Sequence, residues 1–265
     1  MDPLSKKERL VERFNAQHLR RVKRLDNQKQ RLDAQFKQKQ SRLIGHLERI
    51  DANFSDQTLN DKQRAIVEAA LELLHTTTLD ELSLRDIAKT VHMQAPALYW
   101  HFKNKAVLID FMAEAMLQKE FSTLQVRTDE PWDRWLLSVM LRLRKAMLAY
   151  PDGGRVVAGA HPYPAVTLGK IFEFTLASLH SAGIPLGTTG AAASTAIRYT
   201  FGYVIEEQSS PSVEELKSLD MSRLLKHTPY TAQLLKGMGS DSDDERFIAG
   251  SELIIAGIKA TLKNC

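Results

Sequence analysis

Residues 81–105 read ELSLRDIAKTVHMQAPALYWHFKNK, and this stretch decides the fold. Two short helical patterns lie close together in it, joined by a tight turn at His92 and Met93. Ser83 is a typical N-cap for the first helix, and Pro96 suits the first turn of the second. In a helix-turn-helix, one helix braces the unit while the next lies in the DNA major groove. The stretch therefore predicts a DNA-binding unit.

The second helix of this unit begins with short side chains, which allow a backbone to approach base edges closely. Gln94 offers the paired donor and acceptor that adenine requires, and Ala97 can contact a thymine methyl group. Lys105 begins the next helix, where its ammonium and nearby N–H groups can bind a phosphate. The predicted DNA-binding residues are Arg85, Gln94, Ala95, Pro96, Ala97, Tyr99, Trp100, His101 and Lys105. The alternative is a three-helix packing unit, but it would bury three polar-tipped aromatic side chains beside Lys-Asn-Lys.

Helical patterns continue on both sides of this unit, and no segment alternates polar and apolar residues with a period of two. The fold class is therefore expected to be all-α. One helix is expected to start at Asn60 or Asp61, because either side chain could cap it. Beyond the unit, helices are expected over 132–150, 165–182, 188–207 and 245–262.

The first 58 residues form a basic arm, with 14 Lys and Arg against 8 Asp and Glu, although the whole chain has a net charge of only +4. Apolar or permissive residues recur there in alternating steps of four and three, which is the coiled-coil period. Lysine or histidine interrupts this seam four times, so a solvated arm remains an alternative to a long helix with a partner. The arm's role stays open between phosphate contacts, self-association and a surface for another protein.

Composition excludes several other classes of protein. The single cysteine, Cys265, permits no intrachain disulfide, which fits a reducing cytosol and an expected cytoplasmic location. No apolar run approaches the roughly 20 residues of a membrane span, so no membrane partner is expected. The eight histidines lie in separate elements, without a metal-ligand spacing, a Gly-rich phosphate loop or a nucleophile motif. We therefore expect no catalytic residues, no metal, no cofactor and no enzymatic activity.

At this point a family resemblance becomes specific. The run PALYWHFKNKAVLID at 96–110 is very close to the signature of the tetracycline repressor (TetR) family. The similarity continues through PDGG at 151–154, HP at 161–162, FGYVIEEQ at 201–208 and ELIIAGI at 252–258. These motifs cover about residues 60–262 in order, while residues 1–58 lie outside the resemblance. It implies a helix-turn-helix domain at 59–121 and an effector-binding and dimerisation domain at 122–265, which follow the basic arm at 1–58.

The resemblance also implies a mechanism. Two copies would dimerise through a four-helix bundle, here 188–207 and 245–262, and would place two reading helices about one DNA turn apart on a palindrome. A small-molecule effector would then shift the dimer toward a state that binds the operator poorly. The protein would be a ligand-responsive transcriptional repressor. The alternative is a structural nucleic-acid-binding or scaffold protein that acts through the arm.

Two departures from the tetracycline-binding members bear on the effector. Those members hold a magnesium–drug chelate with one histidine and contact the drug with another, and the matching positions here are Val157 and Phe121. Valine cannot ligate a metal, and phenylalanine cannot make that hydrogen bond, so an apolar or aromatic effector is expected in place of magnesium–tetracycline. The predicted pocket residues, which could also be ordinary core, are Phe121, Leu143, Met147, Val157, His161, Phe172, Tyr203 and Glu206. Ala95 and Ala97 replace more polar residues of the tetracycline repressor, so a different operator is expected.

Overall fold

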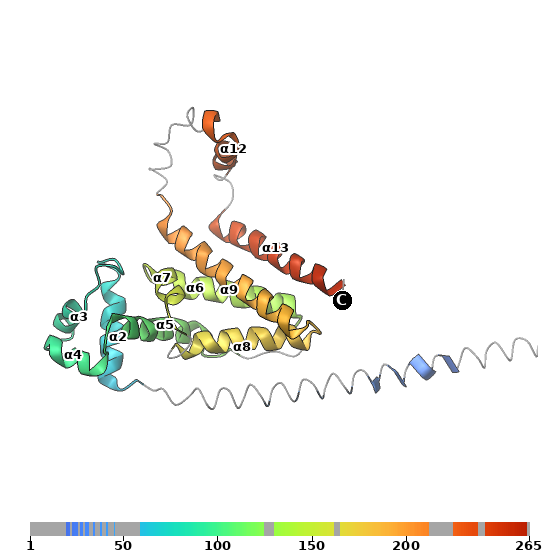
Figure 1. The fold of residues 1–265 in the computed structure, drawn as a ribbon, viewed down its shortest axis with the longest axis horizontal. Helices are drawn as coiled ribbons and strands as arrows, with labels where there is room; N and C mark the ends of the chain where they lie inside the picture. The colour runs from blue at the N-terminus through green and yellow to red at the C-terminus, as the bar shows by residue number, and fades with distance from the viewer. Residues whose placement is uncertain are drawn as a thin grey trace, which may run out of the picture. The chain divides into compact units, whose positions relative to one another are not determined.

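The computed structural model describes residues 59–124, 130–161, 165–211, 225–237 and 242–263, and thirteen residues between Arg20 and Gly45 (Figure 1). The chain divides into two compact units, Met1–Arg49 and Ile50–Cys265. The thirteen described residues of the first unit are helical, and the regular structure of the described ranges in the second is also helical. The all-α expectation is therefore confirmed. Most of the arm, including most of its predicted coiled-coil seam, lies outside the described residues.

Four helices form the N-terminal part of the second unit: α2 (Asp61–Leu73), α3 (Leu84–Thr90), α4 (Ala95–His101) and α5 (Lys105–Phe121). Helices α2, α3 and α5 each begin after a residue whose side chain accepts a hydrogen bond from a backbone amide of the first turn. Asn60 accepts from the Gln63 amide at 2.9 Å, Ser83 from Asp86 at 3.2 Å and Asn104 from Val107 at 2.9 Å. Such N-caps satisfy amides that the helix itself leaves without partners. The predicted starts of these helices are confirmed.

The turn between α3 and α4 passes through His92, whose φ of 54° lies in the left-handed region. The core under the turn buries Ile87, Leu98 and Phe102 almost completely. Phe102 also meets Phe111 of α5 edge to face, with ring centroids 5.5 Å apart. This packing fixes the angle at which α4 leaves the unit, so that one face of α4 stays outside the core.

Six further helices follow α5 in the described ranges: α6 (Trp132–Leu148), α7 (Gly153–Ala158), α8 (Val166–Ser181), α9 (Leu186–Ser209), α12 (Pro229–Gly237) and α13 (Asp243–Lys263). Helix α5 packs against α2 and also against α6, α7 and α8, so it is shared between the DNA-binding part and the larger helical part. Helix α9 packs against α6, α7, α8 and α13, as Figure 1 shows. Among the described residues, no helix combines the length and apolarity of a membrane span.

The core of the larger part depends on close approach of helices. Gly153 opens α7 at a point where a Cβ atom would lie 2.0 Å from the Met147 carbonyl oxygen. On α9, the small residues Ala192, Ala193 and Ala196 are buried beside Phe247 of α13 and Met140 of α6. Small side chains let backbones approach, and dense packing then supplies the dispersion energy. These contacts hold α7 and α9 close to α6, and α9 close to α13.

Candidate nucleic-acid interface and effector domain

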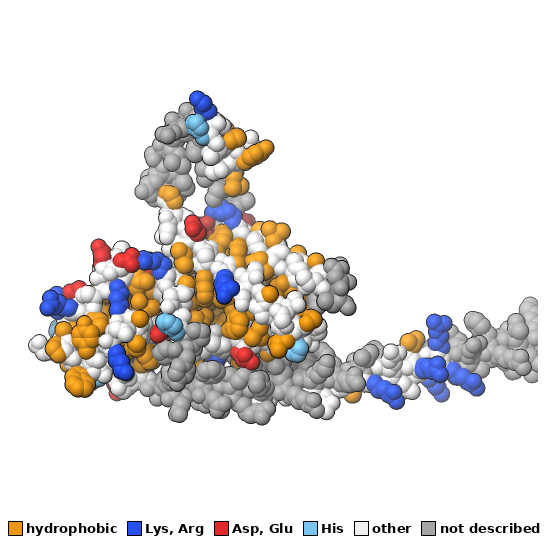
Figure 2. Space-filling model, viewed as in Figure 1, with side chains coloured by type: hydrophobic (Ala, Val, Ile, Leu, Met, Phe, Trp, Pro, Cys, Tyr) orange, Lys and Arg blue, Asp and Glu red, His pale blue; other side chains and the backbone are white. Residues whose placement is uncertain are grey.

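Helix α4 presents most of the predicted reading residues to solvent. Leu98 is fully buried and holds α4 against the unit, whereas Tyr99 is 53% exposed and Trp100 is 90% exposed. Gln94 and Pro96 are also exposed, and Gln94 makes no side-chain cap bond to its own helix. Figure 2 shows apolar side chains gathered on the surface at the end of the molecule where α4 lies. Exposed aromatic side chains that cluster in this way mark a surface that binds a partner.

The remaining reading residues lie around this surface. Ala95, Ala97 and His101 are half-buried, and the short side chains of the two alanines leave the start of α4 open. Arg85 of α3 is exposed. The predicted DNA-binding residues therefore lie on α3, at the start of and along α4, and at the start of α5, and five of them (Arg85, Gln94, Pro96, Tyr99 and Trp100) are exposed. Their contacts with DNA remain a prediction.

Lys105 has a second role that the sequence did not indicate. Its Nζ donates to the Leu79 carbonyl oxygen at 2.5 Å and to the Asp80 carbonyl oxygen at 3.1 Å. These bonds hold the loop between α2 and α3. An ammonium has three donors, so two of them stabilise the loop. Lys103, two residues earlier, is exposed on the same segment.

The same loop is joined to the first turn of α7. Asp152, whose φ of 56° is left-handed, accepts a hydrogen bond from the Leu79 amide at 2.6 Å. Arg155 pairs with both carboxylate oxygens of Asp80, at 2.8 and 3.0 Å. The hydrogen bond and the charge of Arg155 lower the pKa of Asp80 below its ordinary value. These bonds, here called the loop clasp (Leu79, Asp80, Asp152 and Arg155), connect the DNA-binding part to α7.

The predicted effector residues divide into two groups. Phe121, Leu143, Met147 and Val157 are buried on α5, α6 and α7, three helices that pack on one another. Arg142 lies over the Phe121 ring, with its guanidinium carbon 4.7 Å from the centroid. All four are therefore apolar side chains buried on three mutually packed helices, and their role in binding an effector stays a prediction.

The other four predicted residues lie elsewhere or at the surface. Phe172 is 37% exposed on α8, and Glu206 is exposed on α9. The Tyr203 ring packs against Phe247 of α13, with centroids 5.1 Å apart, and so faces away from α7. His161 is exposed, but its Nδ1 lies 3.2 Å from the Asp110 carboxylate. Among the described residues, no hydrogen bond, ion pair or ring contact joins these four to Phe121, Leu143, Met147 or Val157.

Two carboxylates that sequence reasoning missed tie α5 to the segment after α7. Asp110 is only 4% exposed and accepts a hydrogen bond from the His161 amide at 2.8 Å. One helical turn later, Glu114 accepts from the Thr167 amide at 2.7 Å and from the Thr167 hydroxyl at 2.8 Å. The available signal was the placement of two acids one turn apart within the otherwise apolar run IDFMAEAM, at 109–116. Buried acids need such partners.

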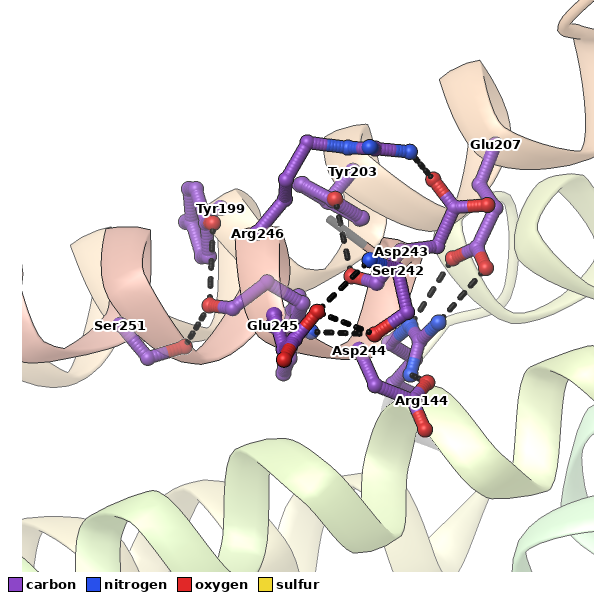
Figure 3. A network of polar contacts seen from close by, with 11 residues as sticks. Arg144, Tyr199, Tyr203, Glu207, Ser242, Asp243, Asp244, Glu245, Arg246 and Ser251 are labelled. Atoms are coloured by element: carbon purple, nitrogen blue, oxygen red, sulfur yellow. Dashed lines mark hydrogen bonds and ion pairs between the residues drawn. The ribbon is translucent and has the colours of Figure 1, made fainter. Parts of the chain in front are cut away.

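A polar network fixes the start of α13 (Figure 3). Arg144 of α6 is 8% exposed and makes two bonds to the Glu207 carboxylate, at 2.6 and 2.8 Å. It also pairs with Asp244 at 2.6 Å and lies over the Phe247 ring. Glu207 contributes most to raising the pKa of Arg144 above its ordinary value, followed by Asp244. The network therefore joins α6, α9 and α13 through one charged side chain.

Comparison with known proteins agrees with this architecture. The family model described as "Tetracyclin repressor-like, C-terminal domain" matches residues 127–262, and the model described as "Bacterial regulatory proteins, tetR family" matches residues 66–111. The chain belongs to the TetR family of bacterial transcriptional regulators. Neither model extends into the arm.

Individual TetR-family relatives cover the same part of the chain. The class A tetracycline repressor from transposon 1721 of Escherichia coli is 37% identical over 195 residues, which is 73% of this chain and 88% of that protein. The class C repressor of Escherichia coli is 35% identical over 204 residues, 76% of this chain and 92% of that protein.

Solved TetR-family structures share the fold. A possible TetR family regulator from Streptomyces coelicolor A3(2) aligns with a TM-score of 0.65 and 29% identity, covering 75% of this chain and 99% of that one. A single-residue variant of TetR from Acinetobacter baumannii AYE, in complex with minocycline, aligns with a TM-score of 0.62 and 30% identity. That alignment covers 76% of this chain and 94% of the other. The helix-turn-helix and the helical regulatory domain of this chain are therefore those of the family.

Proposed function

We propose that this protein is a homodimeric transcriptional repressor that binds a palindromic operator through α4 and is released by an apolar or aromatic effector. It acts by binding and not by catalysis. The observation that carries the proposal is the exposure of Tyr99 and Trp100 on a helix whose Leu98 is fully buried. A helix that is packed on one face and exposes aromatic side chains on the other is expected to bind a partner there. The family identifies that partner as duplex DNA.

The reading chemistry follows from the start of α4. Gln94 provides an amide for an adenine edge, while Ala95 and Ala97 provide only methyl groups, which suit thymine. Tyr99, Trp100 and His101 have polar tips that can reach phosphate oxygens, which position the helix without reading sequence. Loss of Gln94 should therefore change base preference, whereas loss of Tyr99 should weaken binding to all sequences.

Dimerisation would use α9 and α13. In the single chain, Leu253 of α13 is 76% exposed and Leu186 of α9 is 64% exposed. Both helices also expose small residues, including Gly202 and Gly257. A second copy would cover these surfaces and place two α4 helices on two half-sites, since a two-fold axis makes the operator palindromic.

The effector would occupy the region of Phe121, Leu143, Met147 and Val157. All four side chains are apolar and buried, so a ligand that replaced their contacts would also be mainly apolar. Tetracycline with magnesium should leave the operator complex intact, because Val157 supplies no metal ligand. Release of the operator at micromolar drug would refute this part of the proposal.

Two connections could carry the effector's influence to the DNA-binding part. The loop clasp joins α7 to the loop that precedes α3, and Asp110 and Glu114 join α5 to the segment after α7. An effector changes operator affinity only as far as it binds the two states of the dimer differently. Movement of α7 or of the segment after it would alter the loop clasp and the contacts of Asp110 and Glu114 in the middle of α5.

The proposal is tested by electrophoretic mobility shift on a palindromic fragment from the protein's own upstream region. Tyr99→Ala is the cleanest variant, because Lys105 also holds the α2–α3 loop. Losing one net hydrogen bond of about 1.4 kcal/mol should weaken binding roughly tenfold. Tyr230→Ala removes a tyrosine of 85% exposure from α12 and is the matched control. If both variants bind as tightly as the unsubstituted protein, the assigned reading surface is wrong.

A further inference from the structure

The N-terminal arm has exposed basic side chains that lie outside the helix-turn-helix and have no role in its predicted DNA contacts. Within its described part, Arg20, Arg21, Lys23, Arg24 and Arg31 are helical, and all five are exposed. From Arg13 to Arg42 the sequence has ten Lys and Arg residues against two Asp residues. The residues after 58 carry a slight acidic excess, with 22 basic and 24 acidic side chains. The positive charge of the chain is therefore concentrated in the arm.

The spacing of three arginines places their charges on one side of the helix. Arg20, Arg24 and Arg31 are separated by four and seven residues, so with about 3.6 residues per turn they fall within roughly 40° of one side of the helix. At about 1.5 Å per residue, they extend along roughly 16 Å of that side. In the sequence, Arg13 lies seven residues before Arg20, and Arg42 lies eleven residues after Arg31. A stripe of arginines at this spacing matches a linear polyanion better than it matches a small acidic ligand.

We propose that this stripe binds the phosphate backbone of duplex DNA and gives the repressor a second, sequence-independent contact with its operator region. The proposal rests on the proposed function, because the arm is covalently joined to a domain that would already be held on DNA. Tethering converts arm binding into an intramolecular event, so weak phosphate contacts become effective at the high local DNA concentration. DNA is favoured over an arm–arm partner because like-charged stripes repel each other unless an anion lies between them.

Phosphate contacts have a specific experimental signature. Each neutralised phosphate releases counterions, so the logarithm of affinity falls against the logarithm of salt concentration with a slope of about −0.9 per contact. Removing three contacts should make the slope shallower by about 2.7 for each arm that lies on DNA. It should weaken binding to operator and random duplex alike, and the preferred sequence should not change.

The test uses the full-length protein and its R20Q/R24Q/R31Q variant. Fluorescence anisotropy would measure affinity for a selected operator with long flanks and for a random duplex, each over salt concentrations of about 50 to 200 mM, where counterion release is readily measured. R20K/R24K/R31K keeps all three charges and is the matched control, so it should retain the unsubstituted slope. Thermal unfolding should be identical for all three proteins, because the exchanged side chains are exposed.

The outcomes separate this proposal from the proposed function. Specific binding with a shallower slope in the glutamine variant alone supports the arm contact. Specific binding with equal slopes in all three proteins overturns the arm contact and leaves the repressor intact. Absence of any operator preference overturns the repressor, while the slopes on random duplex still decide the arm. Analytical ultracentrifugation of the same proteins gives their mass in solution. If the glutamine variant has a changed mass but an unchanged salt slope, the arm binds other copies of the chain and the proposal is wrong.

Discussion

Replacement of Arg144 by methionine should destabilise the protein far more than replacement of an exposed lysine beside it. The Arg144 guanidinium is enclosed by α6, α9 and α13 and is paired with Glu207, which is itself 14% exposed. Methionine can fill the space of the arginine stem but leaves that carboxylate without its cation. A buried charge that loses its partner is costly because neither water nor protein then satisfies it.

The expected loss of unfolding free energy follows from how exposed the two carboxylate partners of Arg144 are. Removing one member of a buried ion pair costs about 3–5 kcal/mol. Asp244 is 74% exposed, so water replaces most of its interaction and its share is near the surface value of about 0–1 kcal/mol. We therefore expect a loss of about 3 kcal/mol, from Glu207 and the Phe247 ring contact. For a domain of this size, that loss lowers Tm by roughly 6–12 °C.

The assay is urea unfolding followed by circular dichroism at one fixed protein concentration, because dimer stability depends on concentration. Lys145→Met is the matched control, since Lys145 is the residue after Arg144 within α6 and its side chain is 74% exposed. It should change stability by less than about 1 kcal/mol. Glu207→Gln added to Arg144→Met should recover part of the loss. A cost below about 1 kcal/mol for Arg144→Met, or additive costs in the double variant, would refute the reasoning.

Three further predictions concern packing, assembly and pH. Gly153→Ala should destabilise by about 1–3 kcal/mol in urea unfolding, because its Cβ would overlap backbone, whereas Gly187→Ala, which has open space, should not. Leu253→Asp should shift the sedimentation mass from dimer to monomer and weaken operator binding; a persistent dimer would exclude this surface. Arg155 lowers the pKa of Asp80, so their pairing should stabilise the fold above about pH 4 and be lost as pH falls through that lowered value. The loss of Tm caused by Asp80→Asn should therefore be largest at about pH 7 and should shrink as pH falls below about 4, and a loss that does not change with pH would contradict this origin.

The helix-turn-helix was predictable because its signals are local. Ser83 and Asn104 each accept from an amide three residues away, so cap and helix start are readable together. Leu98 followed by Tyr99 and Trp100 likewise separates buried from exposed positions within one turn of α4. At these positions the structure agrees with what the sequence predicts, because each residue and its partner lie within one helical turn.

The long-range polar contacts were not predictable, because their partners are distant in the chain. Asp152 and the Leu79 amide are 73 residues apart, and Arg144 and Glu207 are 63 residues apart. Periodicity also cannot decide which side of α9 faces α7 and which faces α13. Val204 is fully buried against Gly154 of α7, whereas the adjacent Tyr203 packs on Phe247 of α13.

The central claim is that two copies of α4 read two half-sites of one operator. Selection of bound sequences from a random DNA pool by the purified full-length protein tests it most directly. We predict enrichment of an inverted repeat whose half-sites are centred about one helical turn, or roughly 10 base pairs, apart. Recovery of no enriched sequence, or of a single half-site without a symmetric mate, would contradict it.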